Sequence, residues 1–178
     1  MKRLFYNIKA SITRRKSKTE ETLGKYLLRN ALKISTAESC TGGLISSRLT
    51  DVSGSSAYIR MNFVTYSNDA KMKILNVSEE TLLKYGAVSQ ECAYEMAQGL
   101  QQLTGSDIVL CTTGIAGPTG DENKPIGLIY VAVGYKDKIE VREFKLNPHY
   151  NRKNMKFMFS EYALKMVLDI IRMPLCDI

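Results

Sequence analysis

Short strand patterns alternate with helix patterns along this chain, and the alternation limits its fold more than any other feature. Residues 34–37 are typical of a strand, which leads through a glycine-containing turn into a helical segment at 44–49. The same order recurs further along the chain. Residues 57–66 show a strand pattern, and a short helix follows that Ser67 opens and that ends near Leu75. Such alternation is typical of an α/β layered domain.

The second half of the chain predicts further helices, strands and a hairpin. Ser78 and Ser89 are suitable N-cap residues for helices that stop at Gly86 and Gly105. The remaining predicted elements are a strand at 108–113, a hairpin of strands at 127–135 and 139–146, and a helix at 151–172. Because hairpin strands are antiparallel, we expect a mixed sheet within a single domain.

The positive charge of the chain is concentrated at its N-terminus. Residues 1–18 hold 7 of the 25 Lys and Arg residues and no acid, so the other 18 are balanced by 18 Asp and Glu residues. We therefore expect a basic tail at 1–18, a folded domain at 19–173 that does not bind nucleic acid, and a C-terminal tail at 174–178. Acid-free segments of this kind occur both as organelle transit peptides and as plain basic tails. Ser17 and Glu20 form a capping-box pattern that predicts the first helix of the domain, ending near Asn30.

Composition excludes several classes of protein. No window approaches the roughly 18–20 apolar residues of a membrane span, and no secretory signal precedes the domain, so we expect a cytoplasmic protein without a membrane partner. The four cysteines form no C-x-x-C pair, which argues against a zinc or disulfide framework. His149 is the single histidine, so any Ser-His-Asp triad would have to use it.

The turn after the first predicted strand carries a candidate nucleophile. Ser39 follows the strand and precedes Gly42 and Gly43, where amides near Thr41–Gly43 could stabilise a developing oxyanion. A helix N-cap is the alternative role for Ser39. Cys40 is a rival nucleophile, although a small buried thiol is the commoner state of cysteine.

A serine nucleophile needs a base, and histidine is nearly absent. Lys71 is the candidate, because burial lowers a lysine pKa and leaves a neutral amine that accepts a proton. Tyr66, five residues earlier, could relay or donate a proton. The alternative for Lys71 is an exposed lysine on a helix surface.

Two further features could contact a phosphate-bearing ligand, although a plain tight turn is the simpler interpretation of the first. The loop from Gly114 through Gly117 to Gly120 follows a strand and allows close backbone approach, although it matches neither a dinucleotide fingerprint nor a P-loop. Arg152 and Lys156 lie one helical turn apart and could hold a phosphate jointly, or could belong to a solvated face.

Five segments of the chain resemble the successive signatures of the CinA C-terminal domain family. They are Thr36-Ala-Glu-Ser-Cys-Thr-Gly-Gly43, Val64-Thr-Tyr-Ser-Asn-Asp-Ala-Lys71, Gly86-Ala-Val-Ser89, Thr113-Gly-Ile-Ala-Gly-Pro118 and Lys124-Pro-Ile-Gly127. The resemblance covers about residues 22–171 and keeps the family's order. The family includes nicotinamide mononucleotide (NMN) deamidases of the PncC type.

The resemblance implies a three-layer α/β/α sandwich that acts in pyridine nucleotide salvage. It would hydrolyse the carboxamide of NMN to nicotinic acid mononucleotide and ammonia, with no metal and no organic cofactor. Larger CinA proteins carry an additional N-terminal domain, and the chain is similar to the stand-alone form. Because the stand-alone form tends to self-associate, the resemblance also implies a homodimer. The roles implied by matching positions are nucleophile for Ser39, base for Lys71, proton donor for Tyr66, and pocket lining for Thr113 and the turn from Gly114 to Gly117, while Arg152 matches the arginine before the family's final helix. The turn residues Thr41, Gly42 and Gly43 are predicted as substrate contacts through their amides.

Two departures from the family pattern affect the substrate. The stretch 119–123 is one residue shorter than usual, with Asn123 in place of a common acid, and residues 121–124 could be a solvated loop or a lid over the pocket. Lys156 stands where a second arginine is usual, and lysine cannot make the same bidentate phosphate contact. The alternatives are therefore an amidase for another small amide, or a catalytically silent nucleotide- or partner-binding module linked to competence or DNA damage.

Overall fold

A five-stranded mixed sheet forms the centre of the computed structural model, which describes residues 2–120 and 123–172. Its strands are β1 (Ile34–Glu38), β2 (Ile59–Val64), β3 (Ile108–Gly114), β4 (Leu128–Tyr135) and β5 (Lys138–Lys145). They lie in the order β2-β1-β3-β4-β5, with β1 parallel to both of its neighbours and β4 antiparallel to β3 and β5. The expected mixed sheet with a late hairpin is confirmed.

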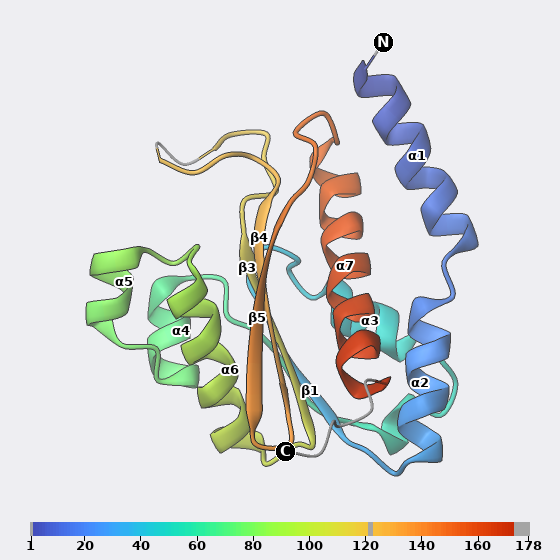
Figure 1. Cartoon of the computed structure of the whole chain (residues 1–178), viewed down its shortest axis with the longest axis vertical. Helices are drawn as coiled ribbons and strands as arrows, with labels where there is room; N and C mark the ends of the chain where they lie inside the picture. Colours follow the sequence, from blue (N-terminus) through green and yellow to red (C-terminus); the bar gives the residue numbers. More distant parts are fainter. Residues whose placement is uncertain (1, 121–122, 173–178) are drawn as a thin grey trace.

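Helices cover both faces of this sheet (Figure 1). One layer consists of α4 (Asn68–Leu75), α5 (Glu79–Tyr85) and α6 (Gln90–Thr104). The opposite layer consists of α2 (Thr19–Arg29), α3 (Leu44–Thr50) and α7 (Arg152–Arg172), with α1 (Lys2–Lys16) packed on α7. Every residue of β1 is buried, as expected for a central strand that is covered on both faces. The three-layer α/β/α arrangement is thereby confirmed.

Serine N-caps begin three helices where the sequence predicted them. The side chains of Ser67, Ser78 and Ser89 each accept a hydrogen bond from the backbone amide three residues later. The predicted strand at 57–66 is shorter than expected, because residues Ser55–Ala57 form a 3₁₀ turn and the strand ends at Val64. Tyr66 therefore lies in the loop before α4.

The predicted capping box at Ser17 is wrong. The N-cap of α2 is Lys18, without a side-chain cap bond, and the Ser17 hydroxyl instead donates to the Glu161 carboxylate at 2.8 Å. The Ser17 Oγ accepts from the Thr19 amide at 3.3 Å, and Glu20, the other half of the predicted box, accepts from Arg48 at 2.5 Å. Contacts with α3 and α7 therefore override the local pattern.

Residues 2–16, which sequence analysis assigned to a basic tail, form the helix α1. Ala10 is fully buried, and the ring of Tyr6 stacks edge-on against Tyr150 with centroids 5.4 Å apart. Arg14 donates to Asn154 at 3.2 Å, across 140 positions of sequence. These partners all lie on or just before α7, so no local pattern could reveal the packing.

The order of the strands determines where a ligand can bind. The chain passes from β1 to β2 on one side and later to β3 on the other, so β1 and β3 flank a topological switch point at their carboxyl ends. Ligands bind at such points in open α/β sheets. Gly99 of α6 contacts the Leu75 carbonyl so closely that a Cβ there would lie 1.8 Å from the oxygen, so glycine allows α4 to pack closely on α6.

No helix within the described ranges combines the length and apolarity needed to cross a bilayer. The predicted C-terminal tail at 174–178 and the acidic residues 121–122 lie outside the part of the chain that the structure describes.

Candidate active site

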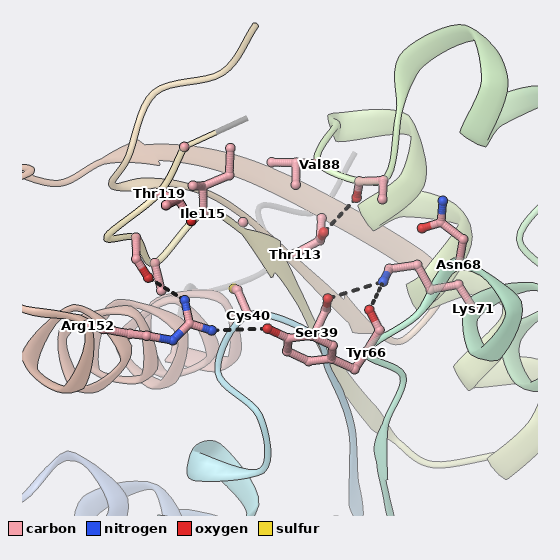
Figure 2. A pocket seen from close by; sticks show the side chains of 15 residues that line it. Ser39, Cys40, Tyr66, Asn68, Lys71, Val88, Thr113, Ile115, Thr119 and Arg152 are labelled. Atoms are coloured by element: carbon pink, nitrogen blue, oxygen red, sulfur yellow. Dashed lines mark hydrogen bonds between the residues drawn. The ribbon is translucent and has the colours of Figure 1, made fainter. Parts of the chain in front are cut away.

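A pocket of about 280 Å³ opens at the carboxyl ends of β1 and β3 (Figure 2). Its lining includes Ser39, Tyr66, Lys71, Thr113, Gly114, Gly117 and Arg152 from the predicted site. The remaining lining residues are Cys40, Asn68, Ala87, Val88, Ile115, Ala116, Thr119 and Gly120. Five separate segments of sequence therefore meet at one cavity.

Ser39 and Lys71 form the polar centre of the pocket. The Lys71 Nζ lies 3.1 Å from the Ser39 Oγ and also contacts the backbone carbonyls of Thr65 at 3.0 Å and Tyr66 at 3.2 Å. Lys71 is 1% exposed, so the alternative of a surface lysine is wrong. Ser39 is not the N-cap of α3 either, because Gly43 holds that position.

Burial changes the protonation of Lys71. Its desolvation lowers the pKa of the ammonium group, and no neighbouring carboxylate counts among the causes that act on it. A neutral amine has two N–H donors and one lone pair. The two carbonyls can take both donors, which leaves the lone pair for the Ser39 hydroxyl proton.

A buried carboxylate fixes the turn that carries Ser39. Glu38, fully buried at the end of β1, accepts hydrogen bonds from the amides of Ile45 at 3.0 Å and Ser46 at 2.8 Å, and from the Ser46 hydroxyl at 2.6 Å. The first turn of α3 is therefore bound by the protein itself and does not present these amides to a ligand. Sequence reasoning missed this cap, although Glu38 belongs to the quoted signature.

We expect Glu38→Gln to lower turnover with little change in KM. A glutamine oxygen cannot replace both carboxylate oxygens, so one or more of the three donors loses its partner, at a cost of about 1–3 kcal/mol. The turn would loosen and the Ser39 hydroxyl would lose its alignment. We therefore expect kcat to fall roughly tenfold. Steady-state kinetics with thermal unfolding would check this, and an unchanged kcat would contradict it.

The three predicted ligand contacts at 41–43 lie outside the pocket lining. The Thr41 hydroxyl pairs with Thr112 at 2.9 Å, and the Gly42 amide donates to the Ser39 carbonyl at 3.1 Å. Gly43 has a φ of 86° at the start of α3. These residues shape the turn, and Cys40 is the residue next to Ser39 that lines the pocket.

The rival nucleophile is poorly suited to its task. Cys40 is 6% exposed, and its desolvation raises the pKa of the thiol to about 12. Because the thiolate is the reactive form, Cys40 is almost wholly unreactive near neutral pH. This geometry favours Ser39 over Cys40.

Tyr66 and Arg152 meet at the rim of the pocket. The Arg152 guanidinium donates to the Tyr66 phenol oxygen at 3.0 Å and also to the Gly117 carbonyl. Tyr66 therefore approaches Lys71 through its backbone carbonyl, while its side chain reaches toward Arg152 (Figure 2). The phenol orients the arginine in this structure.

Hydrogen bonds to backbone carbonyls hold the part of the pocket wall that contains Ala87, Val88 and Thr113. Thr113 donates to the Ala87 carbonyl at 2.6 Å, and Lys124 donates to the carbonyls of Tyr85 at 2.7 Å and Val88 at 2.6 Å. These bonds connect the quoted signatures at 86–89, 113–118 and 124–127. Thr113 thus lines the pocket and also holds Ala87 in place.

A second, basic hollow of about 460 Å³ adjoins the first. Leu44, Arg152, Lys153 and Lys156 line it, so Arg152 belongs to both cavities. The Lys156 Nζ lies 3.1 Å from the position that a Cβ on Gly42 would take, and glycine therefore leaves room for this cation. The structure brings together the predicted pair Arg152 and Lys156.

Among residues 2–120 and 123–172, no group of three or more His, Cys, Asp and Glu side chains is arranged to hold a metal ion. The chemistry available at the pocket is that of a buried hydroxyl, an amine whose pKa burial lowers, and a nearby guanidinium. The fold and this site define an α/β domain with a buried serine–lysine pair at its switch point.

Comparison with known proteins gives the family. The CinA C-terminal domain matches residues 16–171. A CinA-like protein of Chloroherpeton thalassium is 50% identical over 155 residues, which cover 85% of this chain and 37% of that protein. The chain belongs to the CinA C-terminal domain family.

Solved structures agree with this assignment. The crystal structure of the competence/damage inducible protein CihA from Agrobacterium tumefaciens has a TM-score of 0.81 and 36% identity, over 88% of this chain and 98% of that one. A CinA superfamily protein from Escherichia coli has a TM-score of 0.82 and 31% identity, over 85% and 88%. The chain spans about a third of the length of the curated relatives it matches.

Proposed function

We propose that this chain hydrolyses the carboxamide of NMN to nicotinic acid mononucleotide and ammonia. The observation that carries the proposal is the buried Lys71 Nζ, 3.1 Å from the Ser39 Oγ, inside a pocket bordered by a phosphate-compatible basic hollow. A catalytically silent binding module has no need for a hydroxyl next to a desolvated amine.

The first half of the reaction is an acyl transfer to the serine. The Ser39 Oγ bonds to the amide carbon while Lys71 accepts the hydroxyl proton. The Cys40 amide, next to the nucleophile, would stabilise the tetrahedral oxyanion. Lys71 then gives its proton to the amide nitrogen, the C–N bond breaks, and ammonia leaves.

The second half reverses these roles with water. Lys71 takes a proton from water, whose oxygen bonds to the acyl carbon, and then returns that proton to the Ser39 Oγ as the C–O bond breaks. The products balance NMN and one water. The acyl-enzyme on Ser39 should be visible by intact mass during turnover or by hydroxylamine trapping.

The basic hollow suits the other end of the substrate. Arg152 borders both cavities, so a nicotinamide ring in the first pocket would leave the 5′-phosphate near Arg152 and Lys156. Guanidinium and ammonium groups bind phosphate by charge-assisted hydrogen bonds. The arginine geometry is already held by Tyr66 and Gly117.

The test is to incubate the purified chain with NMN and to measure ammonia and nicotinic acid mononucleotide, with Ser39→Ala in parallel. Serine-dependent release of both products in equal amounts supports the deamidase. Equal rates in both proteins overturn it. A folded wild type that releases neither product, but releases ammonia from another small amide, moves the assignment to that amide.

We expect the deamidase rate to rise with pH and then level off. The neutral amine of Lys71 is the active form, and burial lowers its pKa, so activity increases as the pH passes through that lowered pKa and reaches its plateau below the ordinary lysine value of 10.5. A pH profile of kcat/KM would check this. A rate that falls as the pH rises across that range would mean that a protonated group, and not the neutral amine of Lys71, is required.

A further inference from the structure

The outward side of α1 is apolar, although this helix is otherwise basic. Leu4, Phe5, Ile8 and Ile12 are 67%, 62%, 50% and 50% exposed. Leu4, Ile8 and Ile12 recur every four residues, so they form one stripe along the helix, and Phe5 lies next to it. We call these four side chains the α1 outer face.

The opposite side of α1 is already used by the fold. Ala10 is buried, and Asn7 accepts hydrogen bonds from the Asn151 amide at 3.0 Å and the Asn154 side chain at 2.8 Å. The guanidinium of Arg14 lies 4.6 Å from the centre of the Phe157 ring. The helix is thus held in one rotation, and the outer face cannot turn inward.

Cations surround the outer face, and acids are absent. Lys2, Lys9, Arg15 and Lys16 are exposed on α1, and residues 1–18 contain no Asp or Glu. The other 160 residues are balanced in charge, with 18 cations and 18 acids. A groove of about 650 Å³, lined partly by Leu4, Phe5 and Ile8, extends the apolar surface toward His149.

The apolar α1 outer face and the cations around it together indicate which kind of partner this surface binds. A symmetric contact with a second copy would bring two acid-free basic helices together, and like charges repel. A nucleic acid would bind the cations but would gain little from four large apolar side chains. A membrane interface with anionic headgroups accepts both, because apolar side chains enter the headgroup boundary while Lys and Arg meet lipid phosphates.

We propose that the α1 outer face binds the surface of an anionic lipid bilayer. The helix would lie in the plane of the interface and would not cross it. Sequence analysis expected no membrane partner because it considered only spanning segments, and the docking of α1 is what shows which side faces out. A single short amphipathic helix gives weak, reversible attachment.

Co-sedimentation of the full chain with vesicles tests this proposal. Vesicles of phosphatidylcholine with phosphatidylglycerol should carry the protein into the pellet, and vesicles of phosphatidylcholine alone should not. Added salt should release it, because the headgroup attraction is screened. Ser39→Ala should bind as wild type does, which separates this result from the fate of the proposed amidase.

Matched variants locate the contact. Ile8→Glu and Lys9→Glu should each lower partitioning by about tenfold or more, through lost apolar contact and reversed charge. Leu83→Glu and Lys84→Glu are the controls, since both residues are exposed on α5, and Leu83 is 81% exposed. They should leave partitioning unchanged, and circular dichroism would verify the fold of all four.

Several outcomes would overturn the proposal. Equal binding to neutral vesicles, no binding to either, or equal losses in the α5 controls would each do so. Self-association that Ile8→Glu abolishes, without vesicle binding, would assign the outer face to a second copy. Retention on duplex DNA that Lys9→Glu abolishes and Ile8→Glu spares, again without vesicle binding, would assign it to nucleic acid.

Discussion

Ser39→Ala and Lys71→Met should each lower kcat for NMN by about 10²–10⁴, and the double variant should be no slower than the worse single variant. The reason is that the two side chains act as one unit. The Lys71 Nζ lies 3.1 Å from the Ser39 Oγ, and both groups are needed for the same proton transfer. Methionine keeps much of the lysine volume and removes the amine. The measurement is kcat for the wild type, both single variants and the double variant.

Thermal unfolding of the same four proteins is the control. Lys71→Met leaves the carbonyls of Thr65 and Tyr66 without this donor, so a modest loss of stability is expected while the fold persists. If the two substitutions multiplied in their effect on kcat, each residue would act independently, and the proposed proton transfer between them would be wrong.

Arg48→Met should destabilise the protein by about 3 kcal/mol, the low end of the cost of breaking a buried ion pair, because Glu161 keeps Lys165 as a partner at 3.1 Å. Arg48, 4% exposed on α3, donates to Glu161 of α7 at 2.7 Å, to Glu20 of α2 at 2.5 Å and to Ser160 at 2.8 Å. Glu161 itself is 2% exposed. Calorimetry should find unfolding roughly 10 °C lower.

Two comparisons sharpen this prediction. Adding Glu161→Gln to Arg48→Met should recover part of the loss, because the buried carboxylate that lost its closest cation is then gone. Lys73→Met, which breaks the exposed pair with Asp69 at 2.9 Å, should change stability by less than about 0.5 kcal/mol. A double variant less stable than Arg48→Met would contradict this account.

The same pair predicts acid sensitivity. Burial acts to raise the pKa of Glu161, but hydrogen bonds from Arg48, Thr19 and Ser17 outweigh it and hold the pKa at about 2, against an ordinary value of 4.5. A lowered carboxylate pKa gives stability that is present above the ordinary value. That contribution is lost as the pH falls from about 4.5 toward 2.

Local chemistry explains why most elements were predictable. The serine caps at 67, 78 and 89 depend on a side chain and an amide three residues away, and strand β3 is recognisable as an apolar run. The wrong predictions have one cause in common, which is a partner far away in the sequence. Ser17 bonds to Glu161 across 144 positions, and no local pattern records such a partner.

The candidate site also has residues that the sequence predicts and residues that only the fold reveals. Sequence reasoning found Ser39, Lys71 and Arg152 through residue type and the resemblance, and the structure brings them to one pocket. It could not find Asn68 or Val88 as lining residues, nor the cap formed by Glu38, because a pocket wall depends on which segments meet in space. Thr41 and Gly42 were assigned to the ligand on spacing, but their hydrogen bonds go to Thr112 and Ser39.

The sequence by itself determined the order and type of the elements, the family resemblance and the serine–lysine pair, because these follow from local hydrogen bonding, periodicity and residue chemistry. Only the tertiary structure decided that Lys71 is buried, that Glu38 binds the start of α3, and which side of α1 faces outward. Burial and desolvation arise from packing between distant segments, and they lower the pKa of Lys71, which favours its neutral form.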